Sequence, residues 1–376
     1  MRRAKIRFGL LAGAIGLLVF LIFFQQTLLT NLLSFFTGAL EHQSAEVVVF
    51  GADARKSLEG SVVTNEQLAA ISAVPGVANA GPLGQGTFTT RAANGKEVDG
   101  ILFGYALGGP GEPTTLSRGR LPRAPDEGVA SATDAGNGFG LGQTVEILPG
   151  PGGTGPLKIR IVGLADDTRF SVQPVVFVSY DTYRRARAVA NPNASVDSVL
   201  PSAALVEPSD RVDAATLVAR INARVPGVQA LTRADAVAGS PGVQPVRQSF
   251  AVILFLGYLV VTLVTGFFFL ILTVQKTSAL TVLRAIGAPR GYLVRALLVQ
   301  VAVVIAGGIL VGAAVLALAS AGSSPTFPIS VDPRIVVTSG AVVALLALAA
   351  SVIAIRRVLR IDPNDATNPP ALGGLT

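Results

Sequence analysis

The stretch KTSALTVLRAIGAPRGYLVR, residues 276–295, is short, basic and patterned like a helix, and it lies between two long apolar runs. Its apolar side chains Leu280, Leu283 and Ile286 recur at helical spacing. The Gly-Ala-Pro at 287–289 is a natural helix stop, because Gly ends helices and Pro cannot continue them. We therefore expect a short amphipathic helix in a turn between two membrane spans.

Four runs without a charged residue are candidates for crossing a bilayer. They are residues 8–40, 250–275, 296–324 and 335–355. Half of the 376 residues are hydrophobic and only 14% are charged, which is typical of an integral membrane protein. The first run is too long for a signal peptide and is interpreted as a retained anchor. The sequence predicts four transmembrane helices, one N-terminal and three C-terminal.

Basic residues flank these runs and predict the orientation of the chain. They are Arg2, Arg3, Lys5 and Arg7 before the first run, Lys276, Arg284, Arg290 and Arg295 between the second and third, and Arg356, Arg357 and Arg360 after the fourth. Such groups favour the cytoplasm, so both termini are expected inside and residues 41–247 outside. The net charge of +7 is accounted for by these groups, and no nucleic-acid partner is expected.

The segment between the first and second runs is predicted to be a large extracytoplasmic α+β domain. AEVVVFGAD, KEVDGILFGYAL, QTVEILP, LKIRIVGLAD and PVVFVSYD are β-branched runs bounded by turn residues. Two helical stretches, NEQLAAISAVPGV and AATLVARINARVPGV, both end in Val-Pro-Gly-Val. The shared ending, at residues 74–77 and 225–228, indicates two related βα units or a chance identity of four residues.

The expected order of segments follows from these patterns. It is a cytoplasmic N-terminus, first transmembrane helix and stalk (1–40), the extracytoplasmic α+β domain (41–247), the second transmembrane helix (248–275), a cytoplasmic helix and turn (276–291), the third transmembrane helix (292–324), a short outer loop (325–334), the fourth transmembrane helix (335–355) and a cytoplasmic tail (356–376).

The sequence contains little that points to chemistry on this chain. It has no Cys and one His, so no metal site is expected. The spans lack the ionisable groups of an ion path. GPGGTGPLK, residues 150–158, has Pro-Leu where a P-loop requires Lys-Ser/Thr, so no nucleotide site is expected. We predict no catalytic residues, and energy for any transport must come from another protein.

LTVLRAIGAPRGYLVRALLVQ, residues 280–300, resembles the signature of the FtsX-like/MacB-like ABC transporter permeases, and LRIDPNDAT at 359–367 is similar to that family's tail. The N-terminal run most resembles the DevC-type and haem-exporter branches. The resemblance implies that a coupling helix docks on a separate ABC ATP-binding subunit. Its residues are Leu280, Val282, Leu283, Arg284, Ala285, Ile286, Gly287 and Ala288.

The same resemblance implies that ATP and Mg²⁺ are bound by the partner subunit, and that this chain carries no cofactor. ABC ATPases act in pairs, so a second copy of this chain is expected, surrounded by membrane lipid. It further implies mechanotransmission, in which ATP-driven motion passes along the spans to the outer domain.

A helix over residues 8–40 would be about 50 Å long, well beyond a hydrocarbon core of about 30 Å. Its outer turns are therefore predicted to form a stalk below the α+β domain. Glu41 and His42 follow at the end of this stalk. The haem-exporter resemblance makes them candidate substrate ligands, and an ordinary polar helix end is the alternative.

The leading prediction is the permease subunit of an ABC transporter in the cell membrane that exports or extracts an amphiphilic substrate. The alternative is an ABC-type signal transducer that regulates an extracellular cell-wall hydrolase without moving cargo. A membrane-anchored receptor without a motor is a third reading, and it leaves the helix at 276–295 without a role.

Overall fold

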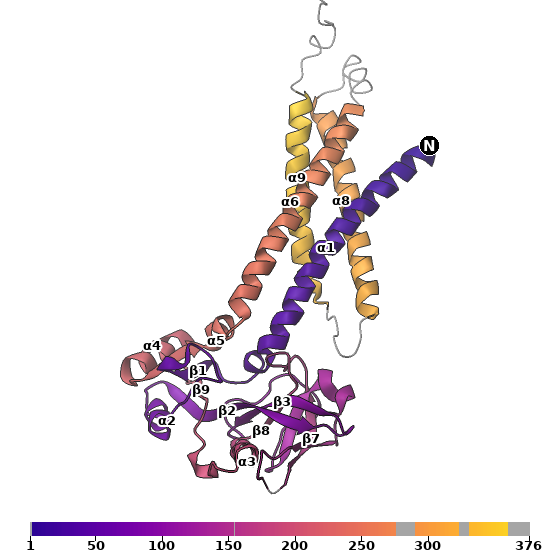
Figure 1. Cartoon of the computed structure of the whole chain (residues 1–376). Coiled ribbons are helices and arrows are strands. Elements are labelled where there is room, and N and C mark those ends of the chain that lie inside the picture. The colour runs from indigo at the N-terminus through magenta and orange to yellow at the C-terminus, as the bar shows by residue number, and fades with distance from the viewer. Residues whose placement is uncertain (1, 154, 276–289, 323–330, 360–376) are drawn as a thin grey trace, which may run out of the picture. The chain divides into compact units, whose positions relative to one another are not determined.

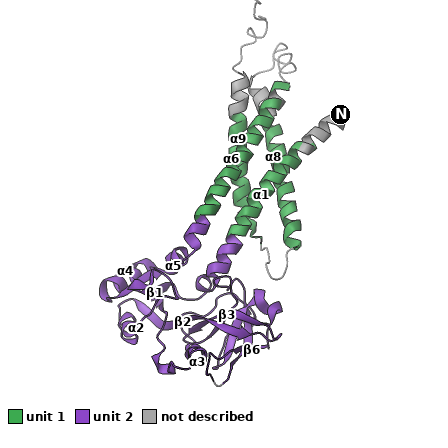
Figure 2. Ribbon diagram, viewed as in Figure 1, with its two compact units in different colours: residues 1–29, 248–323, 329–376 green, residues 30–247, 324–328 purple. Residues whose placement is uncertain are grey.

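The computed structural model describes the chain except for residues 1, 154, 276–289, 323–330 and 360–376 (Figure 1). The chain divides into two compact units (Figure 2). The helical unit comprises Met1–Leu29, Gln248–Ser323 and Ile329–Thr376. The sheet domain comprises Thr30–Arg247 and Ser324–Pro328.

Four long helices carry the apolar runs: α1 (Arg2–Glu41), α6 (Val243–Gln275), α8 (Arg290–Ala321) and α9 (Pro333–Leu359). Each is long and apolar enough to cross a membrane. The predicted fold class, with one such helix before a mixed domain and three after it, is confirmed. The helix bounds extend past the predicted spans, because polar residues such as Arg247 continue the helices beyond their charge-free parts.

Small residues bring α1 and α8 close together in the helical unit. A Cβ placed on Gly16 of α1 would lie 2.7 Å from Cγ1 of Val311 and 3.1 Å from the carbonyl oxygen of Gly308. A Cβ on Gly312 would lie 3.0 Å from the carbonyl oxygen of Gly16. The absence of side chains at these positions therefore permits the backbones to approach, as small residues do between membrane helices.

One half of the sheet domain contains the same β-helix-β unit twice, once before and once after the other half in the sequence. The strands β1 (Val47–Gly51), β2 (Val77–Arg91), β9 (Ala203–Pro208) and β10 (Val228–Thr232) lie in the order β10-β1-β9-β2, all antiparallel. Helix α2 (Asn65–Ser72) precedes β2 and α4 (Ala214–Arg224) precedes β10. Both helices bury apolar side chains in one core cluster with the sheet. This is the ferredoxin-like order, so the two Val-Pro-Gly-Val stretches end equivalent helices.

The second half of the domain is inserted between β2 and β9. Its strands are β3 (Glu97–Tyr105), β4 (Leu116–Gly119), β5 (Glu127–Ser131), β6 (Thr144–Ile147), β7 (Leu157–Ala165) and β8 (Val175–Ser179). They extend the sheet as β2-β3-β8-β5-β7-β4, with β6 pairing to β2 and β7. Helix α3 (Tyr180–Ala190) packs on the sheet. The 15-residue β2 is thus shared by both halves.

The remaining described elements are one short helix and three 3₁₀ turns. They are α5 (Arg233–Gly239), η1 (Ala52–Ala54), η2 (Ala132–Asn137) and η3 (Val196–Ser198).

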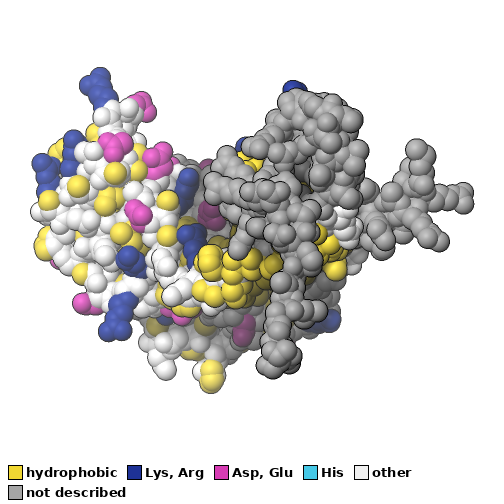
Figure 3. Space-filling view, turned by 90° about the horizontal axis from the view of Figure 1, so that it is seen from above, with side chains coloured by type: hydrophobic (Ala, Val, Ile, Leu, Met, Phe, Trp, Pro, Cys, Tyr) yellow, Lys and Arg dark blue, Asp and Glu magenta, His cyan; other side chains and the backbone are white. Residues whose placement is uncertain are grey.

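Exposed large apolar side chains are concentrated on the long helices. In the described part of the sheet domain they are Val62, Leu116, Leu141, Val172 and Leu200. Figure 3 shows one face of the molecule, where hydrophobic side chains gather in one cluster, with Lys, Arg, Asp and Glu around it and over the rest of the described surface. A soluble surface has few such clusters, so the distribution agrees with helices that face lipid.

Candidate functional site

The predicted coupling helix cannot be placed, because its eight residues lie outside the described part of the chain. Helix α6 ends at Gln275 and α8 begins at Arg290, so the structure describes only the two helices that flank it. Leu280, Val282, Leu283, Arg284, Ala285, Ile286, Gly287 and Ala288 therefore remain predicted partner-binding residues.

Glu41 and His42 lie where α1 ends and the sheet domain begins. Glu41 is the last residue of α1 and is exposed, and His42 is partly exposed. The carbonyl oxygen of His42 accepts hydrogen bonds from the N–H of Thr114 at 2.8 Å and from its hydroxyl at 3.1 Å. No group of three or more His, Cys, Asp or Glu residues that could hold a metal is found in the described ranges. Haem ligation by these two residues remains a prediction.

A loop at residues 166–173 holds the last turns of α1. The N–H groups of Ser171 and Val172 donate to the carbonyl oxygens of Phe36 and Phe35, at 3.1 and 2.8 Å. The N–H of Ala39 donates to a carbonyl oxygen of the same loop at 3.0 Å. Carbonyl groups near the end of a helix are thus partnered by a specific loop, which joins residues 30–41 of α1 firmly to the sheet domain.

A buried ion pair anchors this loop, which we call the α1 clasp (residues 166–173). The guanidinium of Arg169 contacts both carboxylate oxygens of Asp134, with Nε 3.0 Å from Oδ2. The side chains are 8% and 1% exposed. The guanidinium also lies 5.0 Å from the centroid of the Phe35 ring on α1. One arginine therefore links η2, the clasp and α1 by directional contacts.

The clasp contains strained backbone. Asp167, Ser171 and Val172 have φ of +53°, +48° and +65°, a region that residues other than Gly seldom adopt and that a β-branched side chain strongly disfavours. A Cβ on Gly38 of α1 would overlap the carbonyl oxygen of Asp167. Close approach of the clasp to α1 thus depends on a glycine in the helix and on strain in the loop.

The start of α6 joins the same part of the sheet domain. The turn before α6 includes Gly242, where a Cβ would lie 3.8 Å from the ring of Phe36. A small cavity of about 80 Å³ nearby is lined by Phe36, Phe170 and Pro241 among others. Arg233 at the start of α5 donates to the carbonyl oxygen of Gln43 at 2.6 Å. Both chain connections of the domain therefore converge at the clasp.

The helical unit has an apolar groove between α1 and α6. Its volume is about 470 Å³, and Leu21 and Phe24 of α1 and Ile253 and Val260 of α6 are among its lining residues. Leu21, Ile253 and Val260 are exposed. The groove offers an apolar surface to a lipid chain or to another helix.

Sequence reasoning missed the clasp. Asp134 and Arg169 are 35 residues apart, and neither belongs to a motif. The only signal was Gly38 in an otherwise bulky run, since a glycine in a helix indicates a close contact.

The comparisons with known proteins cover most of the chain. Residues 8–224 match the family model of the MacB-like periplasmic core domain, and residues 251–363 match that of the FtsX-like permease C-terminal domain. The first match includes more than half of the 376 residues.

The chain is also similar to curated relatives and to a solved structure. An uncharacterised ABC transporter permease of Mycobacterium tuberculosis is 29% identical over 364 residues, which cover 93% of each chain. The hemin transport system permease HrtB of Staphylococcus epidermidis is 23% identical over 142 residues, 38% of this chain and 41% of the relative. The periplasmic region of MacB from Actinobacillus actinomycetemcomitans is 13% identical, with a TM-score of 0.35, covering 52% of this chain and 92% of that one.

Proposed function

The chain belongs to the family of ABC transporter permeases that combine a MacB-like periplasmic core domain with an FtsX-like C-terminal domain, and from this premise we propose how it works. A separate ATPase subunit binds the cytoplasmic helix at residues 276–288. Its ATP-driven motion passes along α1 and α6 to the sheet domain, which lies on the outer face. The result is the export or extraction of an amphiphilic substrate.

The observation that supports this proposal best is the clasp on α1. Helix α1 has 40 residues without a break, and its outer turns belong to the sheet domain. Because Arg169 and the backbone of the clasp hold these turns by directional bonds, α1 cannot move without the domain. A rigid rod fixed to a domain is what mechanical transmission requires.

The distribution of charge supports the proposed membrane arrangement. The basic flanks of the spans favour the cytoplasm, so both termini are proposed to lie inside. The apolar groove between α1 and α6 supports a homodimer, since a second copy would cover exposed Leu21 and Ile253. Membrane lipid would cover the rest of the exposed apolar surface. The chain itself is proposed to be non-catalytic, with ATP and Mg²⁺ bound only by the partner.

The substrate is proposed to be an amphiphile, with haem as one candidate because HrtB is named for hemin transport. Glu41 and His42 would then ligate iron at the end of α1. Haem titration of the purified chain tests this: Glu41→Ala and His42→Ala should each weaken the absorbance change. Unaltered spectra in both variants would remove haem as the substrate bound at this position.

The test of the main proposal is co-purification. The tagged chain is expressed with its neighbouring genes, and an ATPase is expected in the solubilised complex. Leu283→Ala with Arg284→Glu should release it, whereas Arg224→Glu with Val218→Ala, on α4 of the sheet domain, should not. No ATPase with the unaltered chain would contradict the transporter and the signalling function alike.

The lack of Cys allows a sharper version of this test. A cysteine introduced at Ala285 is the only one in the chain, so any cross-link to the ATPase reports a contact at that position. We expect a cross-link from Ala285→Cys and none from Ala223→Cys on α4. If cells without the protein retain an amphiphile, export is supported, and a cell-wall defect without retention would favour the signalling alternative.

A further inference from the structure

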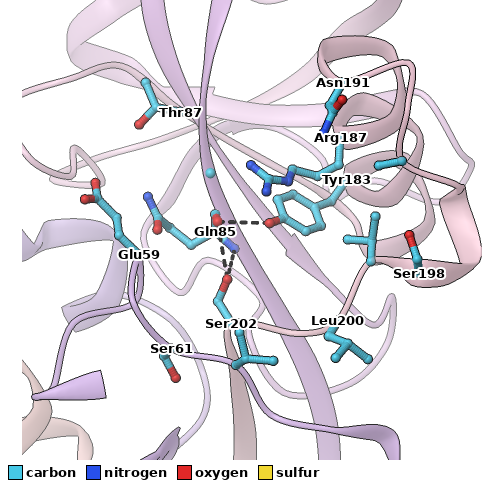
Figure 4. A pocket seen from close by; sticks show the side chains of 14 residues that line it. Glu59, Ser61, Gln85, Thr87, Tyr183, Arg187, Asn191, Ser198, Leu200 and Ser202 are labelled. Atoms are coloured by element: carbon cyan, nitrogen blue, oxygen red, sulfur yellow. Dashed lines mark hydrogen bonds between the residues drawn. The ribbon is translucent and has the colours of Figure 1, made fainter. Parts of the chain in front are cut away.

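A cavity of about 580 Å³ lies beside β2 in the sheet domain (Figure 4). Figure 4 shows Gln85 of β2 near its centre, with Tyr183 and Arg187 of α3 on one side and Glu59 and Ser61 of the loop before α2 on the other. The cavity therefore lies between the two halves of the domain and is built from both.

The cavity is open to one edge of β2. β2 pairs with β9 as far as Leu83 and with β6 from Thr90, and the carbonyl oxygen of Thr89 already accepts from the N–H of Leu148 at 2.9 Å. The carbonyl oxygen of Leu83 accepts a bond from the N–H of Ser202, 2.8 Å away, on the edge that faces β9. Residues two apart in a strand direct their peptide groups to the same edge. Gln85 and Thr87 therefore face this edge, where no described strand pairs with them.

Side chains replace the missing strand at Gln85. Its N–H donates to Oγ of Ser202 at 3.1 Å, and its carbonyl oxygen accepts from the hydroxyl of Tyr183 at 2.9 Å. No such substitute is found for Thr87 in the described part of the chain. The N–H and C=O of Thr87 are thus available to an extended chain, which open strand edges bind readily.

The side chain of Gln85 is the second observation that points to a ligand. It is 4% exposed, yet neither its Nε2 nor its Oε1 has a hydrogen-bond partner in the described residues. A buried amide without partners costs free energy, so such groups are normally paired. A primary amide presents a donor and an acceptor together, as a peptide group does, and it would pair with one.

Tyr183 is fixed in place by two glycines. Gly84 of β2 and Gly104 of β3 are directly paired across the strands. A Cβ on either would overlap Tyr183. The ring therefore lies on this glycine pair, and the wall of the cavity is built before any ligand binds.

Among the arginines of α3, Arg187 differs from the others in its ion pairs. Arg184 is paired with Asp197 at 3.3 Å, and Arg185 with Asp126 at 2.7 Å. Arg187 is exposed, lines the cavity and has no ion pair in the described ranges. A carboxylate of a ligand would supply the missing partner.

Two exposed apolar side chains also line the cavity. Val62 and Leu200 line it, at 55% and 36% exposed, and they are two of the five exposed large apolar residues described in the sheet domain. Exposed apolar groups at the mouth of a polar cavity suit a ligand with apolar side chains.

We infer that this cavity binds the carboxyl-terminal end of an extended peptide, which adds a short strand beside Thr87. The main chain of the peptide pairs with Thr87 and with the amide of Gln85, its terminal carboxylate pairs with Arg187, and an apolar side chain packs on Val62 and Leu200. The inference concerns a site separate from residues 276–288, so it stands or fails independently of the ATPase contact.

The experiment measures saturation transfer by NMR from the full chain in nanodiscs to a pool of pentapeptides. The peptides alternate apolar and polar residues and have free carboxyl ends. We expect binding that Thr87→Pro and Gln85→Leu each weaken about tenfold or more, because they remove the edge N–H and the amide. Thr87→Val retains the N–H and should bind as the unaltered chain does.

A second comparison tests the carboxylate. Amidating the peptides, or changing Arg187→Gln, should weaken binding about fivefold or more, and Arg224→Gln on α4 should have no effect. Thermal unfolding of every variant identifies any that fails to fold. The inference is overturned if the pool shows no transfer, or if folded Thr87→Pro and Gln85→Leu both bind as well as Thr87→Val.

Discussion

Helix α1 is held in two chemically different ways. In the helical unit, Gly16 of α1 lies close to Gly308, Val311 and Gly312 of α8, and apolar side chains of both helices share one core cluster. In the sheet domain, the clasp holds α1 through backbone hydrogen bonds, the Phe35 ring and the buried Arg169–Asp134 pair. Packing contacts between apolar groups depend little on direction, whereas hydrogen bonds and ion pairs depend on it. The two regions of α1 therefore differ in chemistry, with apolar packing against α8 and directional polar contacts with the clasp.

The largest effect is expected from breaking the ion pair of the clasp. Asp134→Ala leaves the guanidinium of Arg169 buried without a counter-charge and should destabilise the sheet domain by about 3–5 kcal/mol. Glu97→Gln breaks the exposed Arg91–Glu97 pair and should cost less than ~1 kcal/mol. Unfolding of the full chain by urea in detergent, with proteolysis of the sheet domain as the readout, measures the loss of stability in both variants.

The double variant Asp134→Leu with Arg169→Met sharpens this result. It removes both charges together, so it should recover most of the lost stability if the cost comes from the stranded charge. Equal instability of the single and double variants would instead assign the loss to packing.

Alanine substitutions at glycines of α1 compare its contact with α8 and its contact with the clasp directly. Gly38→Ala forces a methyl group against the carbonyl oxygen of Asp167 in the clasp. It should destabilise the sheet domain by roughly 2–3 kcal/mol, because a backbone carbonyl cannot move as a side chain can. Gly16→Ala meets mainly the side chain of Val311 and should cost about 1 kcal/mol. Gly13→Ala meets no atom within 4 Å and serves as the control. Thermal unfolding ranks the three, and a larger loss for Gly16→Ala would contradict the comparison.

Relieving the strain of the clasp should increase stability. Val172 has φ of +65° and is 43% exposed. Asn tolerates this conformation better than a β-branched residue, so Val172→Asn should stabilise the sheet domain by about 1 kcal/mol. Val62→Asn, at an exposed valine outside the positive-φ residues, should give no such gain. The midpoint of urea unfolding distinguishes the two.

The smallest effect concerns an ion pair outside the clasp. Hydrogen bonds from the side chain of Arg120 and the N–H of Arg123 lower the pKa of Glu127 to about 2. Because this pKa is below its unfolded value of ~4.3, the contribution is present above that value and lost as pH falls toward about 2. Glu127→Gln should flatten the stability curve slightly in this window. The effect is small because the Arg120 side chain is 42% exposed.

The sequence predicted those features that depend on local patterns. Charge-free runs located the four long helices, and β-branched runs located β1, β3, β6, β7 and β8. These predictions are correct because burial imposes a pattern of apolar residues that can be recognised along the chain. Helix α6 begins earlier than its apolar run, because helical backbone also includes residues such as Arg247.

The clasp and the peptide cavity could not be predicted in this way. Asp134 meets Arg169, and Gln85 meets Tyr183, only once the strands between them have paired. Such contacts depend on the topology of the whole sheet, and no spacing in the sequence encodes them. The coupling residues, and Glu41 and His42 as candidate substrate ligands, stay predictions that rest on resemblance.

The ferredoxin-like order of β10 and β1 has a consequence for how such proteins diversify. Val47, near the entry of the chain into the domain, is paired with Thr232, near its exit. Paired strands are only about 4.8 Å apart, and segments whose ends lie close together are readily exchanged. The sheet domain is therefore a segment that can be exchanged as a whole, because its two ends lie close together. Exchange of the chain between these two ends would replace the whole sheet domain and leave the long helices in place.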